Sequence, residues 1–174
     1  MKERIREIRD IVESVHERGR FKNPPFDFAI YKNLYPKHVI FHTDEFPENA
    51  DGSFRVRNGF PTLIYRRSLS DEERRFRLAH VAGHALIHKR GKFYCSDRPN
   101  TATYPPKGEE INKEEEADLF AIELLMPFDM IADELTEHIH GAKEPEDIVE
   151  QVAKKFGVPL DLAELRLSEF KIAE

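Results

Sequence analysis

The spacing of apolar residues along the chain predicts helices in its first and last parts. Between residues 2 and 18, apolar side chains recur every three or four positions among charged ones: Ile5, Ile8, Ile11, Val12 and Val15. This period places them on one face of an amphipathic helix, and Gly19 is expected to end it. A shorter helix is expected over residues 26–34. After residue 112 the pattern is helical again, with helices expected over 112–126, 129–139, 146–156 and 160–170.

Short runs of β-branched and aromatic residues predict strands between these helical parts. Residues 37–43 form one such run, and residues 92–95 form another. The runs at 53–57 and 61–65 flank Asn58-Gly59, a pair that suits the type I′ turn of a hairpin. Residues 96–108, which hold three prolines, are expected to form a surface loop.

The order of these elements is typical of an α+β fold. We expect a small antiparallel sheet packed on a helical core, followed by a helical C-terminal half. A chain of 174 residues with no internal repeat fits one domain over residues 1–174, in which about residues 140–174 form a C-terminal helical extension.

Composition and charge exclude several function classes. A net charge of −6 argues against a primary nucleic-acid binder, which needs a clustered basic surface. The longest apolar stretch, residues 119–128, is interrupted by Glu123 and is too short to span a bilayer. The charged N-terminus does not resemble a signal peptide. The lone Cys95 fits a reducing cytoplasm and is too few for a disulfide framework or a zinc cluster of cysteines.

The helix expected after residue 70 carries the first candidate chemistry. Ser70 and Glu73 form a capping box that begins it. His80 and His84 follow four residues apart, so they lie on one face and are close enough to share a metal ion. This is the spacing of the zincin H-E-x-x-H helix, in which the Glu is the general base. In this chain position 81 is Val.

A second helix strengthens the metal hypothesis, because a histidine pair alone is more often an ordinary core or surface pair. Glu114 and Asp118 lie four residues apart on the helix that Asn112 caps. A Glu from a neighbouring helix is a common third zinc ligand, and an Asp one turn further can orient a zinc-bound His. Together the two helices predict a zinc site of His80, His84 and Glu114. Glu115 and Glu116 remain alternatives, since the helix phase is uncertain by one residue and acidic residues also favour helix N-termini.

Two further residues near these motifs receive other expectations. His88 lies eight residues after His80, a rise of about 12 Å, so the two cannot bind one zinc on a straight helix. We expect His88 to pack beside the site. Glu123 is expected to face solvent.

The two motifs, residues 77–88 and 114–127, strongly resemble the ImmA/IrrE metallopeptidase family. Its motifs read R-x-x-x-A-H-E-x-x-H and E-x-E-A-N/D-x-F-A-x-x-L-L-M-P. The resemblance implies a gluzincin-like fold, zinc, a bacterial or phage cytoplasm, and cleavage of a helix-turn-helix repressor often encoded beside the peptidase. The family's zinc ligands correspond to His80, His84 and Glu114, and its orienting carboxylate corresponds to Asp118.

The departure from the family is Val81, which stands where the family has its catalytic Glu. Valine cannot exchange a proton, and losing a general base typically lowers a rate by about 10²–10⁴-fold. No catalytic residue is therefore intact, and the sequence predicts a zinc metallo-endopeptidase impaired on its repressor, with Val81→Glu restoring cleavage. The alternative is a catalytically dead, zinc-binding protein that binds and sequesters the repressor. A DNA-binding module around the turn at residues 156–159 is disfavoured, because acidic residues lie where a recognition helix needs basic ones.

Overall fold

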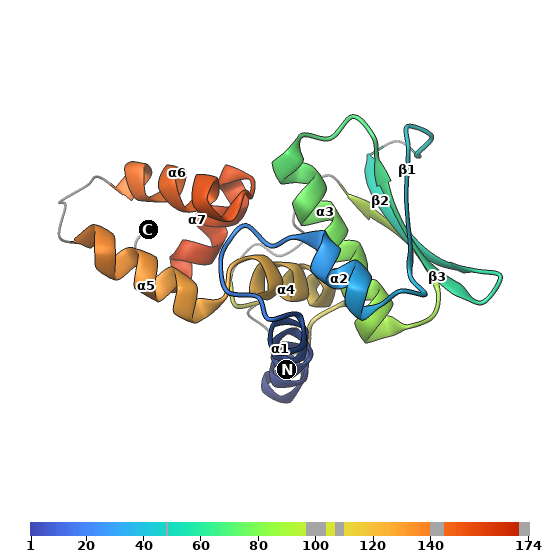
Figure 1. The fold of residues 1–174 in the computed structure, drawn as a ribbon, viewed down its shortest axis with the longest axis horizontal. Helices are drawn as coiled ribbons and strands as arrows, with labels where there is room; N and C mark the ends of the chain where they lie inside the picture. The colour runs from blue at the N-terminus through green and yellow to red at the C-terminus, as the bar shows by residue number, and fades with distance from the viewer. Residues whose placement is uncertain (48, 97–103, 107–109, 140–144, 171–174) are drawn as a thin grey trace.

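A four-stranded sheet packs against one side of a set of helices (Figure 1). The computed structural model describes residues 1–47, 49–96, 104–106, 110–139 and 145–170. Most of the expected loop at 96–108, and residues 140–144 and 171–174 of the expected extension, lie outside these ranges. In chain order the elements are α1 (Lys2–Gly19), α2 (Phe28–Leu34), β1 (Val39–Thr43), β2 (Ala50–Arg57), β3 (Phe60–Arg66), α3 (Asp71–Gly83), η1 (His84–His88), β4 (Lys92–Ser96), α4 (Lys113–Leu125), α5 (Phe128–Ile139), α6 (Pro145–Phe156), α7 (Leu160–Leu167) and η2 (Ser168–Phe170). Among the described helices, none is both long and apolar enough to cross a membrane.

The sheet has the strand order β1-β3-β2-β4. Strands β2 and β3 form the expected hairpin, and both Asn58 and Gly59 take the positive φ that a type I′ turn requires. The expectation of a wholly antiparallel sheet is corrected, because β1 runs parallel to β3. The connection from β1 to β2 skips one strand position, so the third strand inserts between the first two. The α+β class is confirmed.

Helix α3 lies between the sheet and α4, in the middle of the molecule (Figure 1). Its N-terminus has the expected capping box, with Ser70 and Glu73 each accepting from the other's backbone N–H. From Phe76 to Gly83 every residue of α3 is buried. Gly83 allows a close approach to α4, since a Cβ there would lie 3.2 Å from the Cα of Ala117. The two motif-bearing helices are therefore packed together.

The end of α1 differs from the sequence expectation. Gly19 is the last helical residue, and Arg20 takes the left-handed conformation with φ 52°. A Cβ on Gly19 would clash with Cγ2 of Ile30 in α2. Glycine is thus required at this position because α2 packs closely against it, and the helix includes residue 19, where the sequence predicted an end at residue 18.

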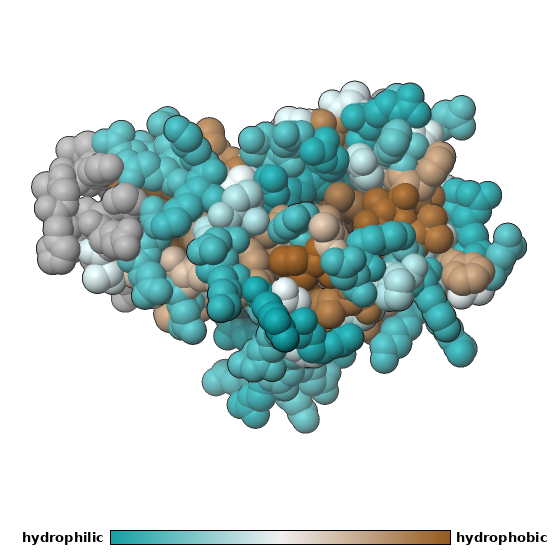
Figure 2. All heavy atoms as spheres, in the orientation of Figure 1, coloured by the Kyte–Doolittle hydropathy of each residue, from teal (hydrophilic) through white to brown (hydrophobic). Residues whose placement is uncertain are grey.

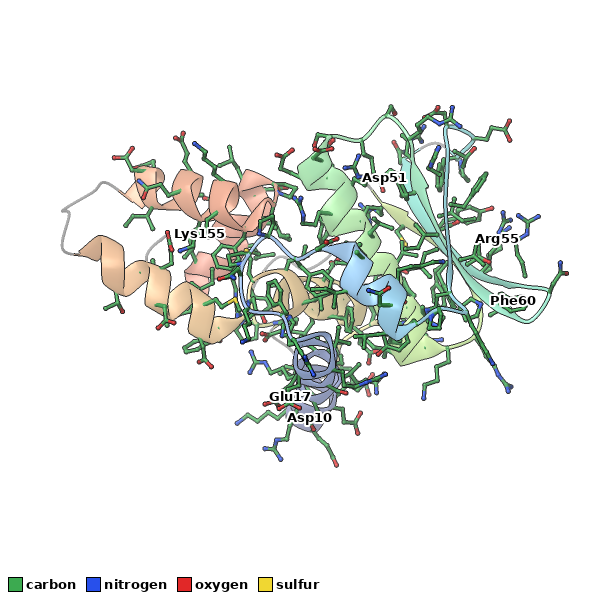
Figure 3. All side chains as sticks on the ribbon, in the orientation of Figure 1. Asp10, Glu17, Asp51, Arg55, Phe60 and Lys155 are labelled. Atoms are coloured by element: carbon green, nitrogen blue, oxygen red, sulfur yellow. The ribbon has the colours of Figure 1, made fainter. Side chains whose placement is uncertain are left out.

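The sheet leaves one face toward solvent. Val39 and Phe41 of β1 and Phe60 at the start of β3 are each more than two-fifths exposed. Figure 2 shows hydrophobic side chains gathered over this part of the molecule, and Figure 3 labels Phe60 at the far end of the β2–β3 hairpin. The other face of the sheet is covered by α3, so the core and the motif residues lie on that side.

A buried polar network joins α4 to the C-terminal helices, and it corrects the expectation that Glu123 faces solvent. Glu123 is buried, and its carboxylate accepts hydrogen bonds from Arg9, Tyr104 and Arg166. The Arg166 side chain is fully buried and also donates to the backbone carbonyl of Met126. From Glu116 to Leu125 every residue of α4 is buried, so this part of the helix has no face toward water.

Replacing Glu123 by Ala should lower the free energy of unfolding by about 3 kcal/mol, because the buried Arg166 loses a charged partner. For a domain of this size, the midpoint of thermal unfolding should fall by about 6–12 °C. Circular dichroism melting measures the change. Glu123→Gln, which keeps the side-chain shape and an acceptor oxygen, should cost less. Equal losses in the two variants would show that the negative charge is not what stabilises the network.

Candidate metal centre

His80 and His84 leave the last turns of α3 and the first position of η1 with their imidazole rings side by side. Their Nε2 atoms lie 3.1 Å apart, and both side chains are fully buried. The four-residue spacing thus has the consequence expected from the sequence. Both Nε2 atoms point toward one spot between α3 and α4.

After His84 the helix widens into one π-helical turn, which ends at Lys89 in the left-handed conformation. This turn brings Nδ1 of His88 to 2.9 Å from Nδ1 of His84, while Nε2 of His88 lies 2.8 Å from Glu116. His88 therefore contacts His84, a candidate ligand, at Nδ1, the ring nitrogen that does not face His80. It packs beside the site as expected. Single π turns inside helices occur often at functional sites.

Glu114 reaches both histidines from the first turn of α4. One carboxylate oxygen lies 3.1 Å from Nε2 of His80, and the other lies 3.4 Å from Nε2 of His84. Partial burial would raise the pKa of Glu114, but these contacts together outweigh it and hold that pKa well below its usual range. Glu114 is thus the carboxylate that the structure brings to the histidine pair.

The two neighbouring acids considered from the sequence have other partners. Glu115 completes the capping box, accepting from the backbone N–H of Asn112 at 2.8 Å. Glu116 pairs with Arg4 of α1 at 2.9 Å and with His88. Both therefore point away from the histidine pair.

Asp118 lies one turn further along α4 and contacts the far nitrogen of His80. Its Oδ1 is 2.7 Å from Nδ1 of His80, and both side chains are fully buried. An ionised Asp can only accept, so Nδ1 donates and Nε2 is directed toward the cluster. Burial alone would lower the pKa of His80, but nearby Cys95, Asp118 and Glu114 raise it well above its usual value. Negative groups around the ring equally favour a cation at Nε2.

Replacing Asp118 by Ala should weaken zinc binding by about 10–100-fold, since the ring of His80 loses its orienting acceptor. Asp118→Asn, whose side-chain oxygen can still accept from Nδ1, should lose less. Competition titration against a chromophoric chelator measures both affinities, and circular dichroism confirms folding. If the Ala variant binds zinc as tightly as the natural chain, Asp118 does not position the ligand.

Cys95 of β4 is a fourth donor at the cluster, and the sequence analysis missed it. Donor atoms of His80, His84, Cys95 and Glu114 all lie within 4.8 Å of one another, and we call these residues the four-residue cluster. Burial raises the pKa of the thiol, but His80 and His84 outweigh it and lower that pKa to about 7. Phe93, two residues before Cys95 on β4, stacks on His84 with 4.2 Å between the ring centroids. Because side chains alternate between the two faces of a strand, Cys95 points to the same side as Phe93. In the sequence, only this alternation hints that Cys95 is near the histidines.

Val81 occupies the position of the missing base and is completely buried. It packs beneath β2 at Gly52, where an added Cβ would lie 3.1 Å from Cγ2 of Val81. The same glycine makes room for Arg77, which forms a buried ion pair with Asp51, labelled on β2 in Figure 3. Position 81 thus offers an apolar contact to the sheet and no group able to carry a proton.

The donor set of the cluster fits a zinc ion. Zinc takes imidazole nitrogen, carboxylate oxygen and thiolate sulfur ligands, usually four in tetrahedral geometry. The side chains come from four elements, α3, η1, β4 and α4, that already bring the donor atoms together, so the site is largely preformed. His80, His84 and Glu114 would hold the ion, with Asp118 orienting His80.

The chain matches a known protein family. The family model described as the IrrE N-terminal-like domain (Peptidase_M78) matches residues 36–168. The match includes the whole sheet, α3, η1 and α4, and hence every residue of the four-residue cluster. No curated protein matches the chain.

Proposed function

Because the chain belongs to the metallopeptidase family of IrrE N-terminal-like domains, we propose that it is a zinc-binding protein that acts on a helix-turn-helix transcriptional repressor and cleaves it poorly. The observation that carries the proposal is the convergence of His80, His84 and Glu114 beside a valine at position 81. If its target is a transcriptional repressor, the chain acts in the cytoplasm and its partner is that repressor.

Each residue of the site has a separate role in the proposed reaction. When bound, zinc supplies a Lewis acid that polarises a carbonyl oxygen. His80, His84 and Glu114 supply the negative and neutral donors that hold it, and Asp118 keeps His80 in the right orientation. Hydrolysis also needs a group that takes a proton from the attacking water and returns one to the leaving amine. Val81 can do neither, which typically lowers the rate by about 10²–10⁴-fold.

A second candidate function is sequestration of the repressor without cleavage. The observation in its favour is that Val81 is fully buried against β2, so the position is used for packing. The family scaffold could then bind a repressor that it does not cut.

The test is incubation of the zinc-loaded chain with the repressor encoded beside it, with and without a chelator. Gel electrophoresis detects fragments, size-exclusion chromatography detects a complex, and elemental analysis should give about one zinc per chain. Slow cleavage that the chelator and His84→Ala both abolish supports the proposal. A stable complex without fragments favours sequestration. Absence of both fragments and complex contradicts the repressor as partner, and absence of zinc contradicts the metal site.

A further inference from the structure

We propose that Cys95 is the fourth protein ligand of the metal, so that the four-residue cluster forms a closed centre in place of an open catalytic one. Catalytic zinc sites have three protein ligands and keep one position open, whereas structural sites use four. The inference rests on the proposed function in one respect, the binding of a metal by His80, His84 and Glu114.

The distances between the donor atoms suit four ligands around one ion. In a tetrahedral zinc site the ligand atoms lie about 3.3–3.8 Å from one another, given bonds of about 2.0–2.3 Å. His80 and His84 nitrogens are 3.1 Å apart, and Glu114 oxygens lie 3.1 and 3.4 Å from them. The sulfur of Cys95 lies within 4.8 Å of the donor atoms of the other three residues. Small side-chain adjustments suffice to place all four on one ion.

Strand β4 points the side chain of Cys95 toward the other three residues of the four-residue cluster. Cys95 is completely buried, while Tyr94 beside it is 47% exposed. Cys95 pairs with Gly52 of β2, and the register shifts between Gly52 and Ala50, next to the pair. A bulge re-aims side chains on the strand. The thiol is thus held against the histidines by the sheet, not by a free loop.

A closed metal centre and a valine at position 81 both disfavour peptide hydrolysis. Peptide hydrolysis at a zinc site requires both an open coordination position and a base, and this chain replaces one by a thiol and the other by a methyl-bearing side chain. A closed centre would clamp α3 with η1, α4 and β4 to one another. The metal then stabilises the family scaffold, and cleavage of its partner would be slow or absent.

The zinc-loaded full chain is tested directly by X-ray absorption spectroscopy at the zinc edge. A closed centre gives one sulfur neighbour at about 2.3 Å with three nitrogen or oxygen neighbours at about 2.0–2.2 Å. A spectrum with nitrogen and oxygen neighbours but no sulfur neighbour would overturn the inference and leave the proposed function intact. Failure to bind zinc would overturn both.

Cobalt(II) substitution provides a second, independent measurement. The natural chain should show a near-ultraviolet thiolate-to-cobalt charge-transfer band, and Cys95→Ala should lose that band. Cys95→Ala should also bind zinc more weakly than Asp118→Ala does. Tyr94→Phe, on the same strand but facing solvent, is the matched control and should keep the band. A band that persists in Cys95→Ala, or is absent from the natural chain loaded with cobalt, contradicts a cysteine ligand.

Discussion

The paired substitution Val81→Glu and Cys95→Ala is expected to raise zinc-dependent cleavage of the repressor by about 10²–10⁴-fold over the natural chain. The first change supplies the missing base. Position 81 is about 100° around the helix from His80, close enough for a Glu to face the metal from beside its ligands. The second change removes the thiol that we propose as the fourth ligand and leaves a position open. Rates are read from gels of intact and cleaved repressor.

The single variants separate the two causes. Val81→Glu alone should gain much less than the pair, because Cys95 still occupies the fourth position, and Cys95→Ala alone should stay slow without a base. Val81→Gln combined with Cys95→Ala is the matched control, since Gln has the size and polarity of Glu but cannot take the proton. A single Val81→Glu variant that cuts as fast as the pair would show that Cys95 does not close the centre. A pair that binds zinc and repressor yet does not cut would disprove the role given to position 81.

A Glu at position 81 enters a packed region, and this bears on the design of the assay. Val81 is fully buried beneath Gly52, beside the Arg77–Asp51 ion pair. Burying a carboxylate costs free energy unless it is paired. The thermal midpoints and zinc content of the Glu and Gln variants at position 81 should therefore be compared first, so that a loss of folding is not read as a loss of chemistry.

Most elements follow from local patterns in the sequence, and the capping boxes show why. Ser70 and Glu73 set the start of α3, and the type I′ turn residues set the hairpin. The second box also contained part of the answer to an ambiguity that the sequence analysis left open. Glu115 is the N3 residue of that box and is occupied by the cap, which removes one of the two alternatives to Glu114; the other, Glu116, is paired with Arg4 and His88.

What the sequence did not predict depends on contacts between distant segments. β1 pairs in parallel with β3 because β3 inserts between β1 and β2, and no local pattern in the sequence encodes this strand order. Glu123 is buried because α1 and α7 cover α4 from two sides and bring Arg9 and Arg166 to it. Cys95 joins the cluster only through the register of β4 on β2, across a shift in pairing. A single cysteine carries no spacing from which a ligand could be inferred.

Removing the metal with a chelator is expected to lower the midpoint of thermal unfolding of the zinc-loaded chain by about 8–16 °C. A ligand that binds only the folded state adds about 4.1 kcal/mol of stability when present at about 1,000 times its Kd. For a domain of 150–250 residues, each kcal/mol corresponds to about 2–4 °C. The four donors lie on α3, η1, β4 and α4, so a bound ion ties these elements together and unfolding must separate them.

Two neighbouring glutamates on α4 provide the matched pair for this measurement. Glu114→Gln removes a charged donor and should make the midpoint nearly insensitive to the chelator. Glu115→Gln keeps the capping box, since Gln also serves at that position, and should leave the chelator effect at its full size. Calorimetry with and without chelator measures both. A zinc-loaded natural chain whose midpoint does not move on chelation would mean that the ion contributes no stability, and the four donors would then not form a structural metal centre.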